Sequence, residues 1–336
     1  MQNNNGCVLF IGPRTFGYET EIQNELERAG YAVDWYDERP SSGPLIKALL
    51  RVWPALISIK SDRYYDKIIK HAATKQYDIV FIIKGEALSL NRLIKLRAVL
   101  PDSRFIYYTW DSLSNFKNGL EKIPYFDKAY SFDLHDAKNN INIVHLPLFY
   151  TCSYEWLAQL NADKDIIPDI GLLFLGSIHT DRYSVMKKIY LESKKSISDL
   201  VLYSHLYFQS KWVFAIRKLI NKDFRSVPWA MVKWHALEKS EVFSLITRCE
   251  VLIDIQHVNQ TGLTMRTIEC IGANKKLITT NDEVRNYDFY NPNNILVVDR
   301  KNPKIPSSFL MTPYQIPKED IYKKYSISEW LKAILA

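Results

Sequence analysis

The 336-residue sequence lacks the marks of several protein classes. Its four cysteines are far apart in apolar or strand-like surroundings, and neither they nor the seven histidines show the paired spacing of a metal site. The cysteines are Cys7, Cys152, Cys249 and Cys270. We therefore expect four buried, reduced thiols, no bound metal and a reducing compartment.

Long apolar runs are also missing. No segment approaches the roughly 20 apolar residues that a membrane-spanning helix needs. Residues 1–6 are polar and carry no basic side chain, so the apolar run after them predicts a first strand and not a secretory leader. No internal repeat, low-complexity tract or coiled-coil heptad is visible. We expect a soluble, cytoplasmic protein, with at most a peripheral contact to the inner membrane.

The charge balance narrows the choice of partners. The chain has 44 Lys and Arg residues against 37 Asp and Glu residues, a formal net charge of +7. This excess suits a phosphate-bearing substrate or an anionic membrane surface, and it does not favour one over the other. No basic run, helix-turn-helix signature or zinc spacing accompanies it, so nucleic acid is not expected as a partner.

Length and pattern predict the fold class. The chain exceeds the roughly 150 residues of a typical domain, which favours two domains that share a cleft. Short apolar runs alternate with helical patterns, which predicts an α/β fold with parallel sheets and helices on both faces. The expected strands are 8–11, 31–36, 78–83, 104–108, 128–132, 142–145, 170–175, 251–255, 276–280 and 295–298.

The stretch 260–281, QTGLTMRTIECIGANKKLITTN, is the most informative part of the chain. It follows a strand-like run and predicts a turn, a helix from about residue 265 and a further strand. Such a unit sets the helix N-terminus at the carboxyl end of a parallel sheet, where it favours a phosphate. Arg266 can add donors to the same anion, and Glu269 can accept hydrogen bonds from ribose hydroxyls. The stretch therefore predicts a nucleotide-diphosphate site.

Further residues are assigned to this expected site. The turn residues Gly262, Leu263 and Thr264 precede the helix and are expected to contact the donor. Lys275 follows the helix and is expected to help Arg266 and the helix N-terminus stabilise a leaving diphosphate without a metal ion.

The segment RTIECIGANKKLI, residues 266–278, resembles the donor-binding motif of the glycosyl transferases group 1 clan. It is most similar to the spore-maturation-like (CgeB-like) branch, whose members include enzymes encoded among lipopolysaccharide and capsule genes. Further patches resemble that branch in chain order, at 10–12, 110–112, 130–133, 174–177 and 288–292.

This resemblance implies a GT-B architecture, with two Rossmann-like domains facing a cleft. It implies an acceptor domain at 1–150, a linker at 151–168, a donor domain at 169–316, and a helix within 317–336 that crosses back onto the first domain. Glu269 matches the clan's ribose-binding glutamate. The clan often has a second glutamate eight positions earlier, where this chain has Thr261, so the donor-sugar contacts and the anomeric outcome stay open.

The implied activity is transfer of a sugar from a nucleotide-diphosphate sugar, linked to UDP, GDP or dTDP, to a glycan acceptor. The branch suggests a lipid-linked acceptor in bacterial surface polysaccharide synthesis, in lipopolysaccharide O-antigen or core or in capsule. Two alternatives remain open: a catalytically silent nucleotide- or glycan-binding subunit, and an isomerase of the nucleotide sugar.

Candidate catalytic residues follow expected strand ends. Asp111 and Asp133 come at the carboxyl ends of two neighbouring strands, where a carboxylate can accept a proton from an acceptor hydroxyl. We expect Trp110 to shield Asp111 from water and so raise its basicity. For Asp133 a helix N-cap is an equal alternative. His257 is a further candidate base.

Three further segments complete the expectations. The loop with Gly12, Phe16 and Gly17 is assigned to the acceptor side, the alternative being a plain strand-to-helix turn. By analogy with the clan, the loop with Gly176, Ser177 and Arg182 lies under the donor phosphates, the alternative being a capped turn.

The third segment, Lys211 to Lys233, combines cations with aromatic residues. A helix that packs its apolar stripe on the core explains this composition, and so does a contact with anionic lipid headgroups or a lipid-linked acceptor.

Overall fold

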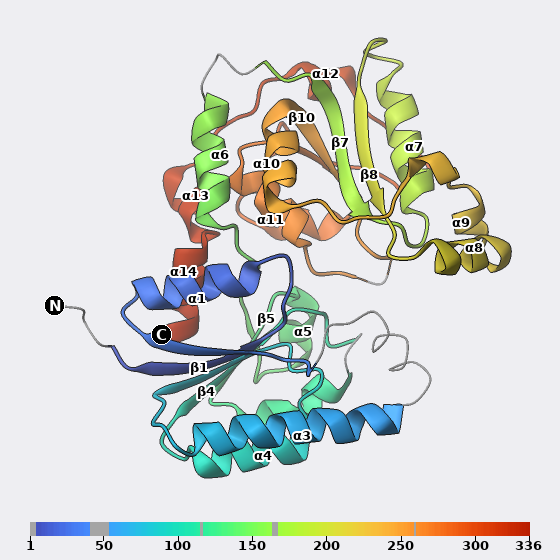
Figure 1. Ribbon diagram of the computed structural model, residues 1–336. Helices are drawn as coiled ribbons and strands as arrows, with labels where there is room; N and C mark the ends of the chain where they lie inside the picture. Colours follow the sequence, from blue (N-terminus) through green and yellow to red (C-terminus); the bar gives the residue numbers. More distant parts are fainter. Residues whose placement is uncertain (1–4, 41–53, 115–116, 163–166, 259) are drawn as a thin grey trace. The chain divides into compact units, whose positions relative to one another are not determined.

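The computed structural model describes residues 5–40, 54–114, 117–162, 167–258 and 260–336. The chain divides into two compact units, each built on a six-stranded parallel sheet (Figure 1). Unit 1 comprises Met1–Pro147 and Ile327–Ala336, and unit 2 comprises Leu148–Ser326. Among the described residues, no helix is both long enough and apolar enough to cross a bilayer.

The sheet of unit 1 has the strand order β2-β1-β3-β4-β5-β6. Its central strands are buried on both faces, as in β3, where all five residues of IVFII are inaccessible. Such continuous apolar runs are typical of parallel sheets covered by helices on both sides. The strands are β1 (Cys7–Gly12), β2 (Ala32–Asp37), β3 (Ile79–Ile83), β4 (Arg104–Thr109), β5 (Lys128–Ser131) and β6 (Val144–His145).

Helices cover both faces of this sheet (Figure 1). α1 (Tyr18–Arg28) and α14 (Ile327–Leu335) lie on one face, and α3 (Pro54–Ala72) and α4 (Leu90–Val99) on the other. η1 (Lys117–Tyr125) and α5 (Leu134–Asn139) complete the unit. α14 is held by its buried Trp330, whose ring lies 5.0 Å from that of Tyr108, and by Tyr130, which donates to the carbonyl of Ala333. The last helix of the chain is thus part of the first unit.

The sheet of unit 2 has the order β12-β11-β10-β7-β8-β9. Its strands are β7 (Ile170–Ser177), β8 (Leu202–Tyr207), β9 (Val232–Lys233), β10 (Cys249–Asp254), β11 (Lys276–Thr279) and β12 (Ile295–Val297). Its helices are α6 (Cys152–Ala162), α7 (Arg182–Ser193), α8 (Lys211–Ile220), α9 (Lys222–Arg225), η2 (Trp229–Met231), α10 (Lys239–Arg248), α11 (Met265–Gly272), η3 (Asp282–Asn286), α12 (Ser307–Met311) and α13 (Glu319–Lys324).

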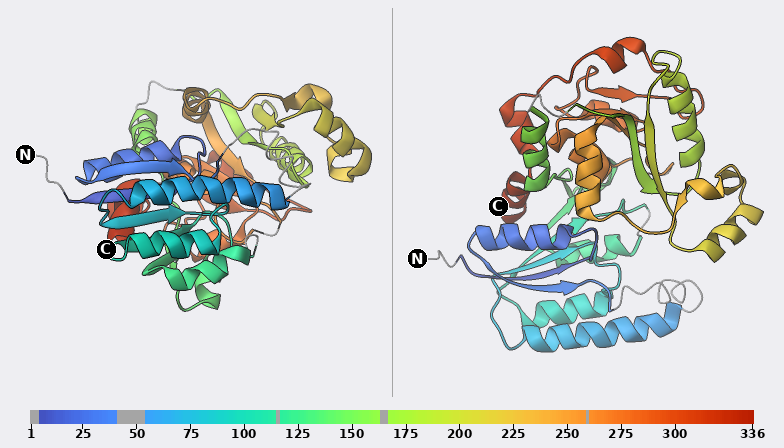
Figure 2. Two further views of the ribbon diagram at one scale, coloured as in Figure 1. Left: turned by 60° about the horizontal axis from the view of Figure 1, so that its bottom comes forward. Right: turned by 45° about the horizontal axis from the view of Figure 1, so that its top comes forward.

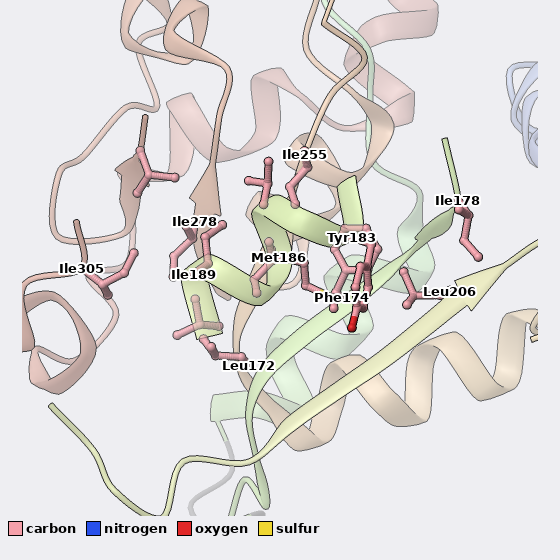
Figure 3. Packing of buried hydrophobic residues seen from close by; sticks show 14 of the residues in the cluster. Leu172, Phe174, Ile178, Tyr183, Met186, Ile189, Leu206, Ile255, Ile278 and Ile305 are labelled. Carbon is pink, nitrogen blue, oxygen red and sulfur yellow. The ribbon is translucent and has the colours of Figure 1, made fainter. Parts of the chain in front are cut away.

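The core of unit 2 lies between the sheet and α7 (Figure 3). Met186 and Ile189 of α7 pack with Leu172 and Phe174 of β7 and with Ile278 of β11. α6 contacts α10 and α11 away from this layer, whereas α8 and α9 form a pair at the margin of the unit (Figure 2). The sheet is therefore covered on both faces, and its carboxyl edge remains the place where loops meet.

Three expected boundaries need correction. The first unit ends at Pro147 and not at residue 150. The segment 151–168 is not a simple linker, because α6 within it packs on α10 and α11 of unit 2; residues 163–166 lie outside the described part. Of the segment 317–336, α13 belongs to unit 2, and only Ile327–Ala336 joins unit 1.

Candidate functional site

The N-terminus of α11 is fixed at the carboxyl edge of the unit 2 sheet by two hydroxyl groups. Thr264 is the N-cap, and its Oγ1 accepts a hydrogen bond from the backbone N–H of Thr267 at 3.2 Å. Both threonine hydroxyls donate to Oδ2 of Asp254, the last residue of β10, at 2.7 and 2.9 Å. The first helical N–H groups, which have no partner within a helix, and the positive end of the helix dipole are thereby held at this edge.

Arg266 and Glu269 lie together on the first turn and a half of α11. Nη1 of Arg266 is 2.8 Å from Oε2 of Glu269, and the two side chains are 20% and 6% exposed. Residues three positions apart face each other on a helix, so the sequence itself favours this pair. The guanidinium is thus oriented by Glu269 before any ligand is considered, and the two residues must act as a unit.

The turn before α11 is held from the neighbouring strand. Asn281, which follows β11, donates through Nδ2 to the carbonyl oxygens of Thr261 and Gly262 at 3.1 and 3.3 Å. Gly262 and Leu263 are buried. The carbonyl of Gly262 and the side chain of Leu263 thus face the protein interior. Both residues support the turn that leads to Thr264.

The loop after β7 comes to the same edge. The sequence predicted that the strand ends at residue 175 and that Gly176 and Ser177 begin the loop. In the structure β7 continues through both residues, so they end the strand. Arg182 donates through Nε to the carbonyl of Ile255 at 2.6 Å and through Nη1 to that of Ser177 at 3.4 Å. Burial lowers the pKa of Arg182, and the carboxylate of Asp254 opposes this shift. The arginine links the ends of β7 and β10.

Arg300 is a site residue that the sequence reasoning missed. It follows β12 and forms a two-point contact with Asp181, at 2.6 and 3.2 Å. Its Nη1 also donates to the carbonyl of Gln256 at 3.1 Å and to the hydroxyl of Thr280 at 3.0 Å. The sequence feature that could have identified Arg300 is its position as a charged residue shortly after a strand, at the edge where ligands bind in parallel sheets. Asp181 does not cap α7 with its side chain, because it is engaged by this arginine.

His257 lies in the loop after β10, and its ring is 5.5 Å from that of His179. Burial, followed by the positive charge of Arg182, lowers the pKa of His179 to about 4. His179 is therefore a neutral imidazole at neutral pH, which adds no charge to an edge already occupied by arginines.

Lys275 is not part of this edge. Its Nζ donates to the carbonyls of Thr247 and Cys249, at 3.0 and 2.8 Å, and Cys249 is the first residue of β10. The side chain therefore lies at the amino end of the sheet, where it lines a pocket of about 240 Å³ with residues such as Tyr290 and Tyr314. The expectation that Lys275 contacts the donor diphosphate is wrong. The N-terminus of α11 lies at the carboxyl edge of the sheet, whereas Lys275 follows the opposite end of this helix.

In unit 1, Asp111 lies at the carboxyl edge but not in a dry environment. Its side chain is 50% exposed, and its Oδ2 is 2.6 Å from Nζ of Lys84. The Trp110 ring turns towards Tyr18 and Tyr108, with centroids 5.9 and 6.3 Å away. The expected shielding of Asp111 by Trp110 is therefore wrong, and the carboxylate is an ion-paired group open to water.

Lys84 belongs to a charged cluster that sequence reasoning missed. Lys84 and Gly85 both have positive φ angles, 66° and 60°, which turns the chain sharply after β3. Burial alone would lower the pKa of Lys84, but the negative charges of Asp111 and two glutamates have the larger effect and raise this pKa.

Glu38 is fully buried after β2 and accepts a hydrogen bond from the N–H of Glu86 at 2.7 Å. Burial raises the pKa of Glu38 to about 7 against the opposing charge of Arg39.

Asp133 takes the structural alternative. It is 1% exposed, it caps α5 by accepting from the N–H of His135 at 3.0 Å, and its other oxygen accepts from the hydroxyl of Ser112. A base engaged in this way is a poor candidate for proton transfer, so Asp133 supports the edge instead.

The loop with Gly12, Phe16 and Gly17, which the sequence predicts on the acceptor side, has an unusual backbone. Phe16 has a φ of 51° and is 81% exposed, and Gly17, with φ 81°, precedes α1. A bulky residue rarely adopts this conformation, and such strain is often found at functional loops. Gly12 ends β1, and a Cβ there would meet the Phe10 ring at 2.8 Å. Both glycines are therefore required by geometry.

The architecture defines a class before any comparison. Two consecutive units with parallel sheets, of which the first is completed by the last helix of the chain, make up a two-domain α/β protein of the GT-B type. The expectation of a GT-B fold is confirmed by solved structures, whereas no protein-family model matches the chain and no curated protein does.

Three solved structures illustrate the likeness. An alpha-glucosyltransferase in complex with UDP and a 13-mer DNA has 14% identity and a TM-score of 0.61 over 98% of this chain and 95% of its own. HepE of Anabaena in complex with UDP has 8% identity and a TM-score of 0.59, with 98% of both chains covered. A UDP-GlcNAc 2-epimerase of Methanocaldococcus jannaschii, in complex with UDP-GlcNAc and UDP, has 12% identity and a TM-score of 0.51 over 98% and 99%. At these identities the likeness shows the fold.

Proposed function

We propose that this protein is a metal-independent glycosyltransferase that moves a sugar from a nucleotide-diphosphate sugar to a glycan acceptor in the cytoplasm. The acceptor is a lipid-linked glycan of bacterial surface polysaccharide synthesis, in lipopolysaccharide or capsule. The resemblance of residues 266–278 to the spore-maturation-like branch supports this finer assignment, and UDP in two similar folds supports the donor class.

The observation that carries the proposal is the start of α11. Asp254 fixes its first turn to the end of β10, so the helix N-terminus offers N–H groups to a phosphate. Arg266 and Glu269 follow on the same helix at 2.8 Å from each other. A diphosphate at the N-terminus would place its oxygens near the guanidinium and its ribose hydroxyls near the carboxylate.

Charge supports departure of a diphosphate from this edge. Arg182 and Arg300 add two guanidinium groups to the edge, and the carboxylates of Asp181 and Asp254 carry the compensating negative charges. Fixed positive groups of this kind stabilise the negative charge that develops on the leaving group. On this basis the reaction needs no divalent cation.

The test is a panel of UDP-, GDP- and dTDP-linked sugars, with and without a glycan acceptor and with excess chelator. Release of nucleoside diphosphate that increases with acceptor and persists in chelator supports the proposal. Activity that disappears with chelator overturns the metal-independent part, and tight nucleotide binding without turnover for any donor indicates a binding subunit.

An epimerase of the nucleotide sugar is the second candidate, because the same fold is found in the UDP-GlcNAc 2-epimerase. Mass analysis and NMR of the products separate the two. An epimerase converts the donor to an isomer of equal mass without a sugar acceptor, whereas a transferase yields a glycosylated acceptor.

A further inference from the structure

The outer face of α8 carries a stripe of large apolar side chains that contact solvent. Trp212, Ile216, Leu219 and Ile220 are 83%, 57%, 74% and 73% exposed. They follow one another at intervals of four, three and one residues, so they lie along one side of the helix. Of the two alternatives that the sequence left open, packing of the stripe on the core is excluded by this exposure.

A single aromatic residue anchors the helix from its other side. Phe214 is fully buried, and its ring lies 5.4 to 5.9 Å from the rings of Phe208, Phe224 and Trp234. Trp229 closes this aromatic group at 5.0 Å from Phe214 and is itself 46% exposed. The helix is thus held firmly by its inner side while its apolar stripe points outward.

The polar ends of α8 are already satisfied within the protein. Ser210 caps the start by accepting from the N–H of Val213, and Arg225 donates to the carbonyls of Lys218 and Leu219 at 3.2 and 2.6 Å. The Lys218 ammonium donates to the carbonyl of Arg225 at 3.2 Å. Backbone groups satisfied in this way can leave water at little cost.

Basic residues accompany the stripe in the sequence. The segment 211–233 contains six cations, of which three belong to α8 itself, and a single acid, Asp223. Lys211, Lys222 and Arg225 are exposed. Apolar side chains with a tryptophan and a basic border match an anionic bilayer, where the apolar groups enter the acyl boundary and the cations meet the headgroups. A protein partner with an acidic groove is the competing occupant.

We propose that α8 and α9 form a docking surface for an anionic lipid bilayer, with the side chains of Trp212, Ile216, Leu219 and Ile220 inserted. Figures 1 and 2 show the two helices next to each other at the margin of unit 2. The inference adds the membrane to the proposed function, since a lipid-linked acceptor would lie in it. It rests on α8 and α9 and stands without any sugar transfer.

The test uses the full chain and sedimentation with vesicles of mixed phosphatidylglycerol and phosphatidylcholine, without donor or acceptor. Trp212→Ala and Leu219→Ser should each weaken the partition coefficient about tenfold, as expected for loss of one inserted apolar side chain. Lys222→Glu should weaken binding on the order of tenfold to the mixed vesicles only, because it reverses a charge near the headgroups.

Two matched controls come from the same unit. Trp156 on α6 is 56% exposed and Leu191 on α7 is 52% exposed, so Trp156→Ala and Leu191→Ser remove similar groups elsewhere. Both should bind vesicles like the wild type. The proposal is overturned if the wild type does not sediment, if it binds pure phosphatidylcholine equally well, or if the controls lose as much. It is also overturned if light scattering shows a dimer that Leu219→Ser dissociates while vesicle binding is absent.

Discussion

At the scale of single residues, Glu269 and Arg266 decide how a nucleotide could be held. Their 2.8 Å contact in a mostly buried setting means that removing either residue also strands the other. A simple loss of affinity is therefore not enough to assign a ribose contact. The ligand series has to separate the ribose from the phosphates.

The first prediction uses this separation. Glu269→Ala should weaken binding of a nucleoside diphosphate by about 1.5 to 3 kcal/mol, the range for hydrogen bonds to a charged group. Binding of inorganic diphosphate should change much less, because it has no ribose. Calorimetry of both ligands on a variant with an unchanged melting profile provides the measurement. An equal loss for both would mean that Glu269 acts only by orienting Arg266.

The second prediction concerns Asp111, which pairs with Lys84 at 2.6 Å and is half exposed. If this carboxylate accepts the proton of the acceptor, Asp111→Asn should lower transfer by ~10² to 10⁴ while nucleotide affinity is kept. Lys84→Met is the companion variant, since it removes the ion-pair partner of Asp111 and shows whether transfer depends on that pair. Full activity of the Asn variant would remove Asp111 from the mechanism.

At the scale of elements, α11 depends on the strand that precedes it. Asp254 receives both threonine hydroxyls, so the position of the helix N-terminus is set by one carboxylate. The sequence could not show this bond, because Asp254 and Thr264 are separated by a loop whose path is set by Asn281. The helix itself was predictable from its spacing.

The third prediction is that Asp254→Ala lowers the free energy of unfolding by about 2 to 4 kcal/mol, through loss of two hydrogen bonds to a charged acceptor. It should also weaken nucleotide binding, since the N-terminal turn is no longer fixed. The control is Asp282→Ala, which removes an exposed carboxylate paired with Arg285 and should change stability by about 0.5 kcal/mol or less. Equal stability of the Asp254 variant and the wild type in urea unfolding would contradict this role.

The fourth prediction concerns the turn after β2, where burial raises the pKa of Glu38 from 4.5 to about 7. Between these two pH values the folded chain binds more protons than the unfolded chain. The contribution of protonated Glu38 to the free energy of unfolding is therefore fully present below about pH 4.5 and is lost as the pH rises to about 7. In Glu38→Gln the side chain stays neutral throughout this pH range, so the variant does not lose this contribution. Its stability relative to the wild type should rise by up to about 3 kcal/mol across the window, at about 1.4 kcal/mol per pKa unit. Parallel urea midpoints of the two proteins at acidic and neutral pH would refute it.

Elements with continuous or helical apolar patterns were predictable, and those set by tertiary contacts were not. The strand at 104–108 is β4 to within one residue, because its apolar run is buried on both faces. β8 was missed, since Leu202–Tyr207 mixes polar with apolar residues near the sheet margin. For the stripe on α8 the sequence left the core and a lipid surface as alternatives, because helical spacing identifies a face without saying what it meets.

The candidate site was predictable in part for the same reason. Thr264, Arg266 and Glu269 come from one local stretch, and the structure keeps them on one helix start. Arg300 joins from 34 residues beyond Arg266 through the order of strands, which only the fold reveals. Lys275 was misplaced because nearness in sequence does not distinguish the two ends of a helix.

At the scale of the whole molecule, the two units divide the expected chemistry between them. Asp111 and the strained loop at Phe16 belong to unit 1, whereas α11, Arg182 and Arg300 belong to unit 2. The proposed transfer draws on both units, whereas the proposed nucleotide contacts all come from unit 2. The donor part of the account can therefore be tested without knowing the acceptor.

The central claim is that a nucleoside diphosphate binds at the start of α11, and hydrogen exchange of the backbone amides tests it most directly. With saturating UDP, GDP or dTDP, the amides of residues 262–268 should be protected. The amides beside the pocket at Tyr314 should exchange as before, since that pocket lies at the other end of the sheet. Protection at Tyr314 without change at 262–268, or no protection by any of the three nucleotides, would contradict the account.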